Sequence, residues 1–465
     1  MAQPSTKRID LLAHGPVGKA LLALSAPAIA GMLVMAIYNV ADTFFVSLLR
    51  DTTAIAATGV VFPIFQLIGA VGLTFGMGAA SVISRRLGEN NRRAADEAGA
   101  TALYTSAAVG IAFSLTGAVL IEPILTLFGA TDSILAEATL YGRLIIGGSV
   151  FQIVNMTVGN ILRSEGAALH SSAGQIVGAV LNIALDPLFI FTLNMGITGA
   201  AAATVVAQAV AMLALLSFYL LKRGVLSPLS LRHVRIEAKT YAAIMTLGLP
   251  TLVRQVLGSV SFGVLNNAAA AFGDSAIAAI SLMFRVFMLL FMALIGLAHG
   301  LQPLAGYNYG AHRFDRVRAT MQIVFVTVIS LGAVASVGGY MLAPAIMRFF
   351  APQDARVIVM GAQAMRYMAF ALVPIGLVVM FGGIFQAFGD GRSAMILAAG
   401  QQGLFLIPAV LILPRLFGLP GVFAAQPVGF ILAFAIGLLL MRRTYRNLRL
   451  SEQEYGGAPV PAESE

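Results

Sequence analysis

Apolar stretches long enough to cross a membrane recur along almost the whole chain. A hydrocarbon core of about 30 Å requires about 20 helical residues. Windows of at least this length lie at 17–49, 54–84, 97–121, 137–162, 167–192, 198–221, 240–271, 276–307, 319–345, 358–387, 393–414 and 420–441. They predict an all-α polytopic membrane protein with twelve transmembrane helices. The composition agrees, because 59% of the residues are hydrophobic and only 11% are charged, unlike a water-soluble domain.

Composition also restricts the chemistry. The chain has no cysteine, which removes disulfides, thiol nucleophiles and thiolate metal sites. Its five histidines are scattered without the spacing of metal ligands. The formal net charge of +9 could indicate a nucleic-acid partner, but the basic residues lie in short runs between the apolar windows. We therefore predict no enzyme, no cofactor and no nucleic-acid partner.

The basic runs predict the orientation. Most of the 29 lysines and arginines lie on alternate connections, the strongest being "RRLGENNRR" (85–93), "KRGVLSPLSLRHVRIEAK" (222–239), "HRFDRVR" (312–318) and "RRTYRNLR" (442–449). The positive-inside rule places these connections, and with them both termini, in the cytoplasm.

The second half of the chain repeats the first at an offset of 222 to 223 residues. Gly78 falls on Gly300. In the same way, Gly88 falls on Gly310. An even number of spans in each half gives both halves the same orientation, so the symmetry axis lies along the membrane normal. The repeat predicts two pseudo-symmetric six-helix lobes around a central cleft, the geometry of alternating access; a duplicated scaffold without moving parts is the alternative.

The repeat and the basic runs together divide the chain into five segments. We expect a cytoplasmic N-terminal segment, a first lobe, a cytoplasmic linker, a second lobe and a disordered cytoplasmic tail. Their predicted bounds are 1–16, 17–222, 223–239, 240–449 and 450–465. The tail is predicted to be disordered because it is polar and carries Gly and Pro.

Two carboxylates of the first lobe lie inside predicted spans, where an ionisable side chain is costly and usually functional. Asp42 lies eight residues before Arg50, at the external end of its span. Asp186 lies eight residues before Asn194, at the same face. At 1.5 Å per residue, each carboxylate is about 12 Å inside. We therefore expect the two acids at the same depth.

Further polar side chains share this level. Asn182 lies one turn deeper on the helix of the second acid, and Thr204 enters from the same side in the next span. Tyr38 and Asn39 lie one turn before the first acid. Such a set suits Na⁺, which prefers oxygen ligands, or shared protons, because a buried carboxyl beside a like charge takes up a proton more readily. The coupling ion stays open, as does the alternative that each acid only holds helices together.

The second lobe has no matching acid pair. The repeat puts Leu265 and Pro408 at the positions that correspond to the two acids. The spans of this lobe carry Arg254 and Arg285 instead, which line the cleft, pair with an acid or reach the membrane interface. Coupling is therefore expected in the first lobe only.

Three residues are candidates for conformational roles. Pro27 removes a backbone hydrogen bond inside the first span and favours a bend there. Pro187, directly after the second acid, predicts a local break in that helix. Glu165 lies at the cytoplasmic turn between the fourth and fifth spans, where it caps the following helix or takes part in cytoplasmic gating.

Together these features resemble the multidrug and toxic compound extrusion (MATE) family. The resemblance covers about residues 15–445 and is carried by "YNVADTFFV" (38–46), "GAASVISRRLGENNRRAADEA" (78–98), "NILRSEGAA" (160–168), "LNIALDPLFIF" (181–191) and "QPLAGYNYGAHRFDRVR" (302–318). The details are most similar to the bacterial drug-exporter branch of the family.

The resemblance implies a transporter of the bacterial cytoplasmic (inner) membrane that admits H⁺ or Na⁺ and exports organic, often cationic, amphipathic drugs or dyes. The positions that it carries over are Pro27 for helix bending, Asp42, Asn182, Asp186 and Thr204 for the cation, and Glu165 for the acid of the "RSEG" motif. We expect a monomer whose partners are small-molecule substrates and membrane lipids.

Two alternatives belong to other classes. A flippase of lipid-linked saccharides, from the same wider superfamily, predicts a cleft rich in basic residues, for which only Arg254 and Arg285 are candidates. A channel would need no asymmetric repeat with one buried acid pair. A membrane-embedded enzyme would need a cluster of nucleophile, base and metal ligands that the chain lacks.

Overall fold

The computed structural model describes residues 4–49, 51–221, 229–352 and 354–455, and this part of the chain is helical without strands. The first half forms α1 (Pro4–Ala13), α2 (Val17–Ser47), α3 (Thr52–Gly88), α4 (Arg92–Leu127), α5 (Asp132–Gly147), α6 (Ser149–Ser164), α7 (Ala168–Pro187), the π-helical turn η1 (Leu188–Thr192) and α8 (Gly196–Leu220). The second half forms the 3₁₀ turn η2 (Leu231–His233), α9 (Ala238–Ala270), α10 (Asp274–Gly310), α11 (Phe314–Met341), α12 (Ala343–Phe350), α13 (Ala355–Ala369), α14 (Leu372–Phe388), α15 (Gly391–Ala399), the π-helical turn η3 (Gly400–Leu406), α16 (Ile407–Phe417) and α17 (Leu419–Tyr455).

These helices account for the twelve predicted spans. In the described part of the chain, ten helices are long and apolar enough to cross a membrane, and two bent pairs bring the number to twelve. The pair α5 and α6 is bent by 42°, and the pair α13 and α14 by 52°. Gly147 and Gly148 lie at the first bend, where two adjacent glycines weaken the helix. Pro374 lies just after the second bend. In a straight helix its ring would clash with the carbonyl group of Phe370, which favours the bend.

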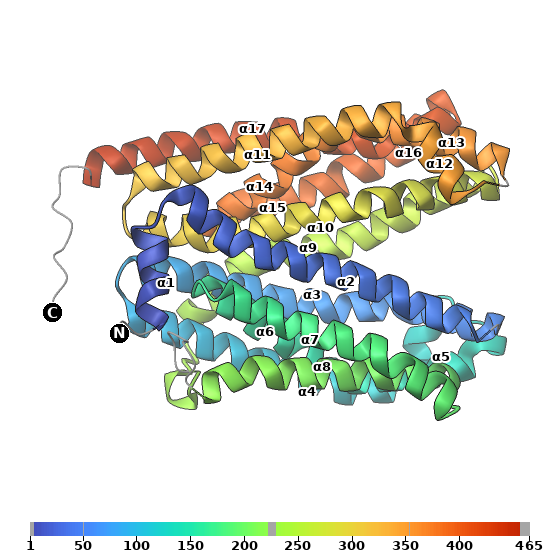
Figure 1. The fold of residues 1–465 in the computed structure, drawn as a ribbon, viewed down its shortest axis with the longest axis horizontal. Helices are drawn as coiled ribbons and strands as arrows, with labels where there is room; N and C mark the ends of the chain where they lie inside the picture. The colour runs from blue at the N-terminus through green and yellow to red at the C-terminus, as the bar shows by residue number, and fades with distance from the viewer. Residues whose placement is uncertain (1–3, 50, 222–228, 353, 456–465) are drawn as a thin grey trace.

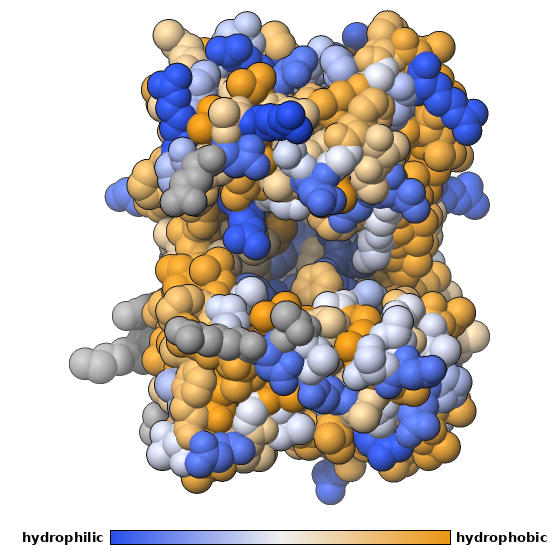
Figure 2. All heavy atoms as spheres, turned by 90° about the vertical axis from the view of Figure 1, so that its right-hand side faces the viewer, coloured by the Kyte–Doolittle hydropathy of each residue, from blue (hydrophilic) through white to orange (hydrophobic). Residues whose placement is uncertain are grey.

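The helices form two lobes that diverge from one end of the molecule. Helices of the first half gather in the lower part of Figure 1 and those of the second half in the upper part, and the two sets separate toward the right. Helix α1 and the C-terminal end of α17 both lie at the left. Figure 2 views the opposite end and shows a hollow between the lobes, with hydrophilic side chains inside it and largely apolar flanks. The predicted two-lobed bundle around a central cleft is confirmed. We call the two ends of the molecule the closed end, at the chain termini, and the open end.

The lobes meet where α2 packs against α10 and α3 packs against α9 and α10. At the closed end, the backbones of α3 and α10 approach so closely that only glycine fits. A methyl group at Gly88 would overlap the carbonyl oxygen of Tyr307, and one at Gly310 would overlap that of Arg85. The repeat relates the two contacts to each other, because an offset of 222 residues carries Gly88 to Gly310 and Arg85 to Tyr307. The repeated glycines therefore form the seam between the lobes.

Helix α1 lies across this seam and contacts both lobes, which the sequence did not predict for the segment 1–16. Leu12 is 1% exposed. Arg316 of α11 donates through Nη2 to the carbonyl oxygens of Leu12 (3.1 Å) and Gly15 (2.7 Å). On the other lobe, Arg8 Nη2 lies 3.4 Å from His170 Nδ1. The N-terminal helix thus ties the closed end of one lobe to that of the other.

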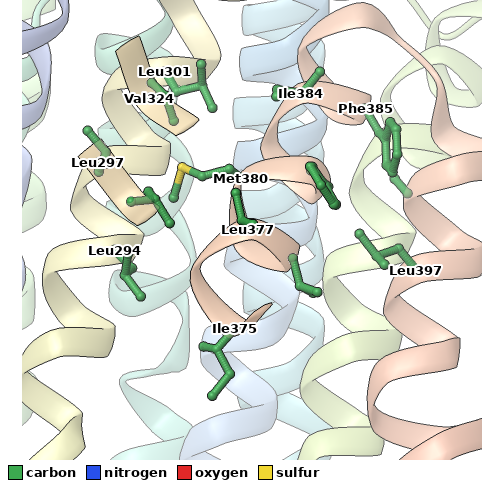
Figure 3. Packing of buried hydrophobic residues seen from close by; sticks show 14 of the residues in the cluster. Leu294, Leu297, Leu301, Val324, Ile375, Leu377, Met380, Ile384, Phe385 and Leu397 are labelled. Carbon is green, nitrogen blue, oxygen red and sulfur yellow. The ribbon is translucent and has the colours of Figure 1, made fainter. Parts of the chain in front are cut away.

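Each lobe is filled by aliphatic and aromatic side chains. Figure 3 shows this packing in the second lobe, where α10, α11, α14 and α15 interdigitate. The residues labelled there are Leu294, Leu297, Leu301, Val324, Ile375, Leu377, Met380, Ile384, Phe385 and Leu397. The outer flanks are largely apolar, and hydrophilic side chains lie inside the hollow between the lobes.

Two predicted boundaries differ from the described structure. The predicted disorder of 450–465 is wrong for its first residues, because α17 continues to Tyr455; residues 456–465 lie outside the described residues. The predicted linker 223–239 is described only from 229 onward, and α9 begins at Ala238, within this segment.

Candidate functional site

The structure brings the two predicted acids of the first lobe together. Asp42 comes from α2 and Asp186 from α7, and they lie close enough for their charges to interact. Asp186 is fully buried. Among the described residues, Oδ1 of each carboxylate is buried without a hydrogen-bond partner. Because an unpartnered buried acceptor is costly, these two atoms provide a place for a proton or a cation.

Asn182 and Thr204 lie next to the acid on α7. The amide of Asn182 donates through Nδ2 to Asp186 Oδ2 (3.0 Å). Its Oδ1 accepts from the backbone N–H (3.1 Å) and the hydroxyl (3.2 Å) of Thr204. This amide orientation satisfies both ends of the side chain, whereas the opposite one leaves Oδ1 facing only acceptors. Asn182 therefore connects the acid on α7 to α8.

The local helix geometry follows from Pro187. A proline removes the hydrogen bond to the carbonyl of residue i−4, which is Ile183. In the structure, α7 ends at Pro187 and the chain continues as the π-helical turn η1. Turns of this kind are frequent at functional sites. The predicted local break beside Asp186 is confirmed.

Two tyrosines enclose the acids. Tyr38 of α2 is buried beside Thr204 and interacts with both carboxylates. Tyr141 of α5 interacts with the same two charges. The sequence predicted Tyr38 from its helical spacing to Asp42 but missed Tyr141, because nothing in the sequence indicates that a side chain of α5 reaches the two acids.

A cavity of about 180 Å³ adjoins this pocket. Asn39 and the pocket residues Tyr38, Asn182 and Thr204 line it. Most of its other polar lining consists of carboxamides from α3, α6, α7, α8 and α9. These are Gln66, Gln152, Asn155, Gln175, Gln208 and Gln255. The sequence analysis missed this set, although an inventory of neutral polar residues within the spans would have found it. We call it the amide cavity.

Comparison with known proteins identifies the family. The family model MatE matches residues 27–188 and 250–411, two segments offset by the 223 residues of the internal repeat. The chain belongs to the MATE family. It is therefore a multi-pass membrane transporter, and the resemblance seen in the sequence is confirmed.

Individual MATE proteins resemble the chain over most of its length. The multidrug export protein MepA of Staphylococcus saprophyticus is 29% identical over 406 residues, which is 87% of this chain and 89% of the relative. An outward-facing multidrug resistance MATE family transporter of the MOP superfamily superposes with a TM-score of 0.90 at 27% identity, covering 97% of this chain and 100% of that chain. A crystal structure of a MATE in complex with MaL6 has the same TM-score and identity, covering 95% of this chain and 99% of that chain.

Two predicted residues of this MATE protein lie away from the acid pocket. Glu165 is fully buried where α6 ends at the closed end, and it accepts a hydrogen bond from Tyr219 Oη (3.4 Å) and interacts with Arg8 of α1. Pro27 lies inside α2, which runs as one helix past it.

The two arginines of the second lobe do not join the acid pocket either. Arg285 of α10 lines a cavity of about 600 Å³ in that lobe. Arg254 of α9 lines a small neighbouring cavity of about 30 Å³, and Gln401 borders both. In the described part of the chain, neither guanidinium takes part in an ion pair or hydrogen bond. The cavities of the second lobe therefore carry positive charges, whereas the acid pocket of the first lobe carries two carboxylates.

Proposed function

We propose that this protein exports amphipathic, often cationic, drugs in exchange for H⁺ or Na⁺ by alternating access. The observation that carries the proposal is the pair of buried, unpartnered carboxylate oxygens of Asp42 and Asp186 beside the amide cavity. Multidrug export by the MepA relative supports the class of substrate. The activity needs no cofactor and no catalytic cluster, so the protein is a transporter without enzymatic chemistry.

Three side chains couple the ion to the drug in this mechanism. Tyr38, Asn182 and Thr204 line the amide cavity and also contact or approach the acids. An ion bound at the acids rearranges these side chains and thereby changes the affinity of the cavity for drug. A ligand shifts a conformational equilibrium only by its difference in affinity between the two states. The shift is transmitted by α2, which bends near Pro27.

The geometry favours the proton over Na⁺ as the coupling ion. The side-chain oxygen of Asn182 is engaged with Thr204, and one buried oxygen on each acid has no partner among the described residues. Hard cations take several oxygen ligands, whereas a shared proton needs only two. Na⁺ binding would require Asn182 to turn away from Thr204.

The basic connections support a placement in the bacterial inner membrane with both termini in the cytoplasm. The closed end then faces the cytoplasm, and the conformation is outward-facing, in agreement with the likeness to an outward-facing MATE transporter. Glu165, buried at the closed end near α1, is assigned to cytoplasmic gating. We also propose that the two lobes span residues 17–222 and 240–449 and that the protein is a monomer surrounded by lipid.

An efflux assay tests this function. Protein in liposomes loaded with a cationic dye should export the dye when a proton gradient is imposed, and a Na⁺ gradient should be less effective. Asp42→Asn should abolish export while the protein still elutes as a folded, monodisperse species. Asp274→Asn, at an exposed site in the first turn of α10, is the matched control and should export normally. Full export by Asp42→Asn would refute the coupling role, and export without either gradient would refute antiport.

A further inference from the structure

The 600 Å³ cavity of the second lobe is the repeat counterpart of the amide cavity. It is bounded by α9, α10, η3 and α17. The repeat relates α9 and α10 to α2 and α3, and η3 and α17 to α7 and α8. Residues that line one cavity fall on residues that line the other, namely Tyr38 on Ser261, Gly178 on Gln401 and Thr204 on Gln426. The fold therefore contains two symmetry-related cavities, of which the mechanism above uses one.

The second cavity carries a charge, whereas the lining of the amide cavity is neutral. The position of Asp42 is taken by Leu265, which lines the second cavity. Its lining contains no Asp or Glu, and its one charged member is Arg285. In the described part of the chain, that guanidinium has no acidic partner. A positive charge without a counterion, in a cleft bounded by apolar helices, attracts an anion.

The remaining walls are those of an amphipath-binding site. The aromatic rings of Phe262, Phe284 and Phe291 and the thioethers of Met288 and Met292 offer an apolar, adaptable surface. Three glutamines add amide donors, and Oε1 of Gln426 is buried without a partner among the described residues. The volume lies within the range of cavities that hold small molecules. A ligand that fits combines an apolar chain or ring with a negatively charged head.

We propose that the second-lobe cavity binds amphipathic organic anions, with Arg285 holding a carboxylate, sulfonate or phosphate head and the phenylalanine and methionine side chains holding the apolar body. Guanidinium groups pair with all three heads through charge-assisted hydrogen bonds. The anion comes from a free amphipath or from an anionic membrane lipid. This site goes beyond the drug and ion sites of the first lobe, and its test measures binding without transport.

The absence of tryptophan makes a local reporter available. Phe284→Trp places the single indole of the protein in the second-lobe cavity. A bromine atom quenches indole fluorescence only at contact, so 9,10-dibromostearate should quench this reporter saturably in neutral detergent. Its methyl ester, which lacks the charge, should quench weakly and without saturation. Phe65→Trp, in the amide cavity, should not show saturable quenching by the anion.

Substitutions at Arg285 in the reporter background test the charge. Arg285→Gln should weaken dibromostearate binding about tenfold or more, and Arg285→Lys should retain most of the affinity. Arg415→Gln removes an exposed arginine of the same lobe that does not line the cavity and should have no effect. Equal quenching by acid and ester, or unchanged affinity in Arg285→Gln, would overturn the proposal.

Competition identifies the source of the anion. Displacement of dibromostearate by phosphatidylglycerol, but not by phosphatidylcholine, would support an anionic lipid as the occupant. Failure of phosphatidylglycerol to displace it, with saturable binding retained, would support a free amphipathic anion. Equal displacement by both lipids would show that the head charge is not recognised and would overturn the proposal.

Discussion

The substitution Gly310→Ala tests the seam at the closed end. A Cβ atom at this position would lie 2.9 Å from the carbonyl carbon of Arg85 and 3.0 Å from its Cα, and would overlap the carbonyl oxygen. Because these atoms belong to the backbone, no side chain can rotate away. Carbon atoms pack at about 3.5–4.0 Å, so α3 and α10 must separate by roughly 1 Å. Overpacking costs about 1–3 kcal/mol, which disfavours the closed seam about 5- to 150-fold.

Thiol labelling measures this shift, since the chain has no cysteine of its own. Ser84→Cys places a thiol on α3 at a fully buried position that faces Gly306 of α10. In purified protein, Gly310→Ala should accelerate the reaction of this thiol with a maleimide at least fivefold, by about the population shift. The matched control is Gly59→Ala on α3, the helix that carries the thiol. An added Cβ at this position meets no atom within 4 Å. Equal labelling rates in the two variants would refute the argument that the glycine seam holds the closed end together.

Three further substitutions test other parts of the structure. Arg316→Gln removes the hydrogen-bond donors that hold α1, so amide hydrogen exchange in α1 should accelerate about tenfold. Arg348→Gln, which removes an exposed arginine of α12, should leave this exchange rate unchanged. Gln175→Leu removes a buried, unpartnered oxygen from the amide cavity and should stabilise the fold by about 1 kcal/mol in thermal unfolding, while weakening dye binding in a titration. Thr204→Val removes the hydroxyl that donates a hydrogen bond to Asn182 and should slow dye efflux about tenfold. Thr198→Val removes a hydroxyl that donates to the backbone carbonyl of Met195 and should leave the efflux rate unchanged.

Much of the acid pocket could be predicted because depth in a membrane helix is a local property. A fixed rise per residue places Asp42 and Asp186 at one level, and a helical turn places Asn182 beside the second acid. Tyr141 could not be found in this way, since its position depends on which helix lies next to α2 and α7. The six carboxamides that were missed in the amide cavity come from five different helices, so no spacing along the sequence relates them.

The fold shows the same division. Gly147 and Gly148 are visible as a weak point, but the 42° bend there depends on what α5 and α6 pack against. The role of α1 was missed because its contacts with Arg316 and His170 are long-range, and the segment is too short to span a membrane. The continuation of α17 to Tyr455 was missed because a polar tail says little about whether a helix that is already formed will extend into it.

The amino-acid sequence determines that this chain crosses the membrane twelve times, that its halves are related by a repeat and that one half carries two acids at equal depth. These properties are local, because in hydrocarbon each helix must satisfy its own backbone hydrogen bonds and must be apolar over its length. The tertiary structure decides which face of each helix meets which neighbour, since rotation about the helix axis is set by packing between helices. That rotation brings Asp42 to Asp186, turns the repeated glycines Gly88 and Gly310 into a seam, and leaves one of the two related cavities neutral and the other with the positive charge of Arg285.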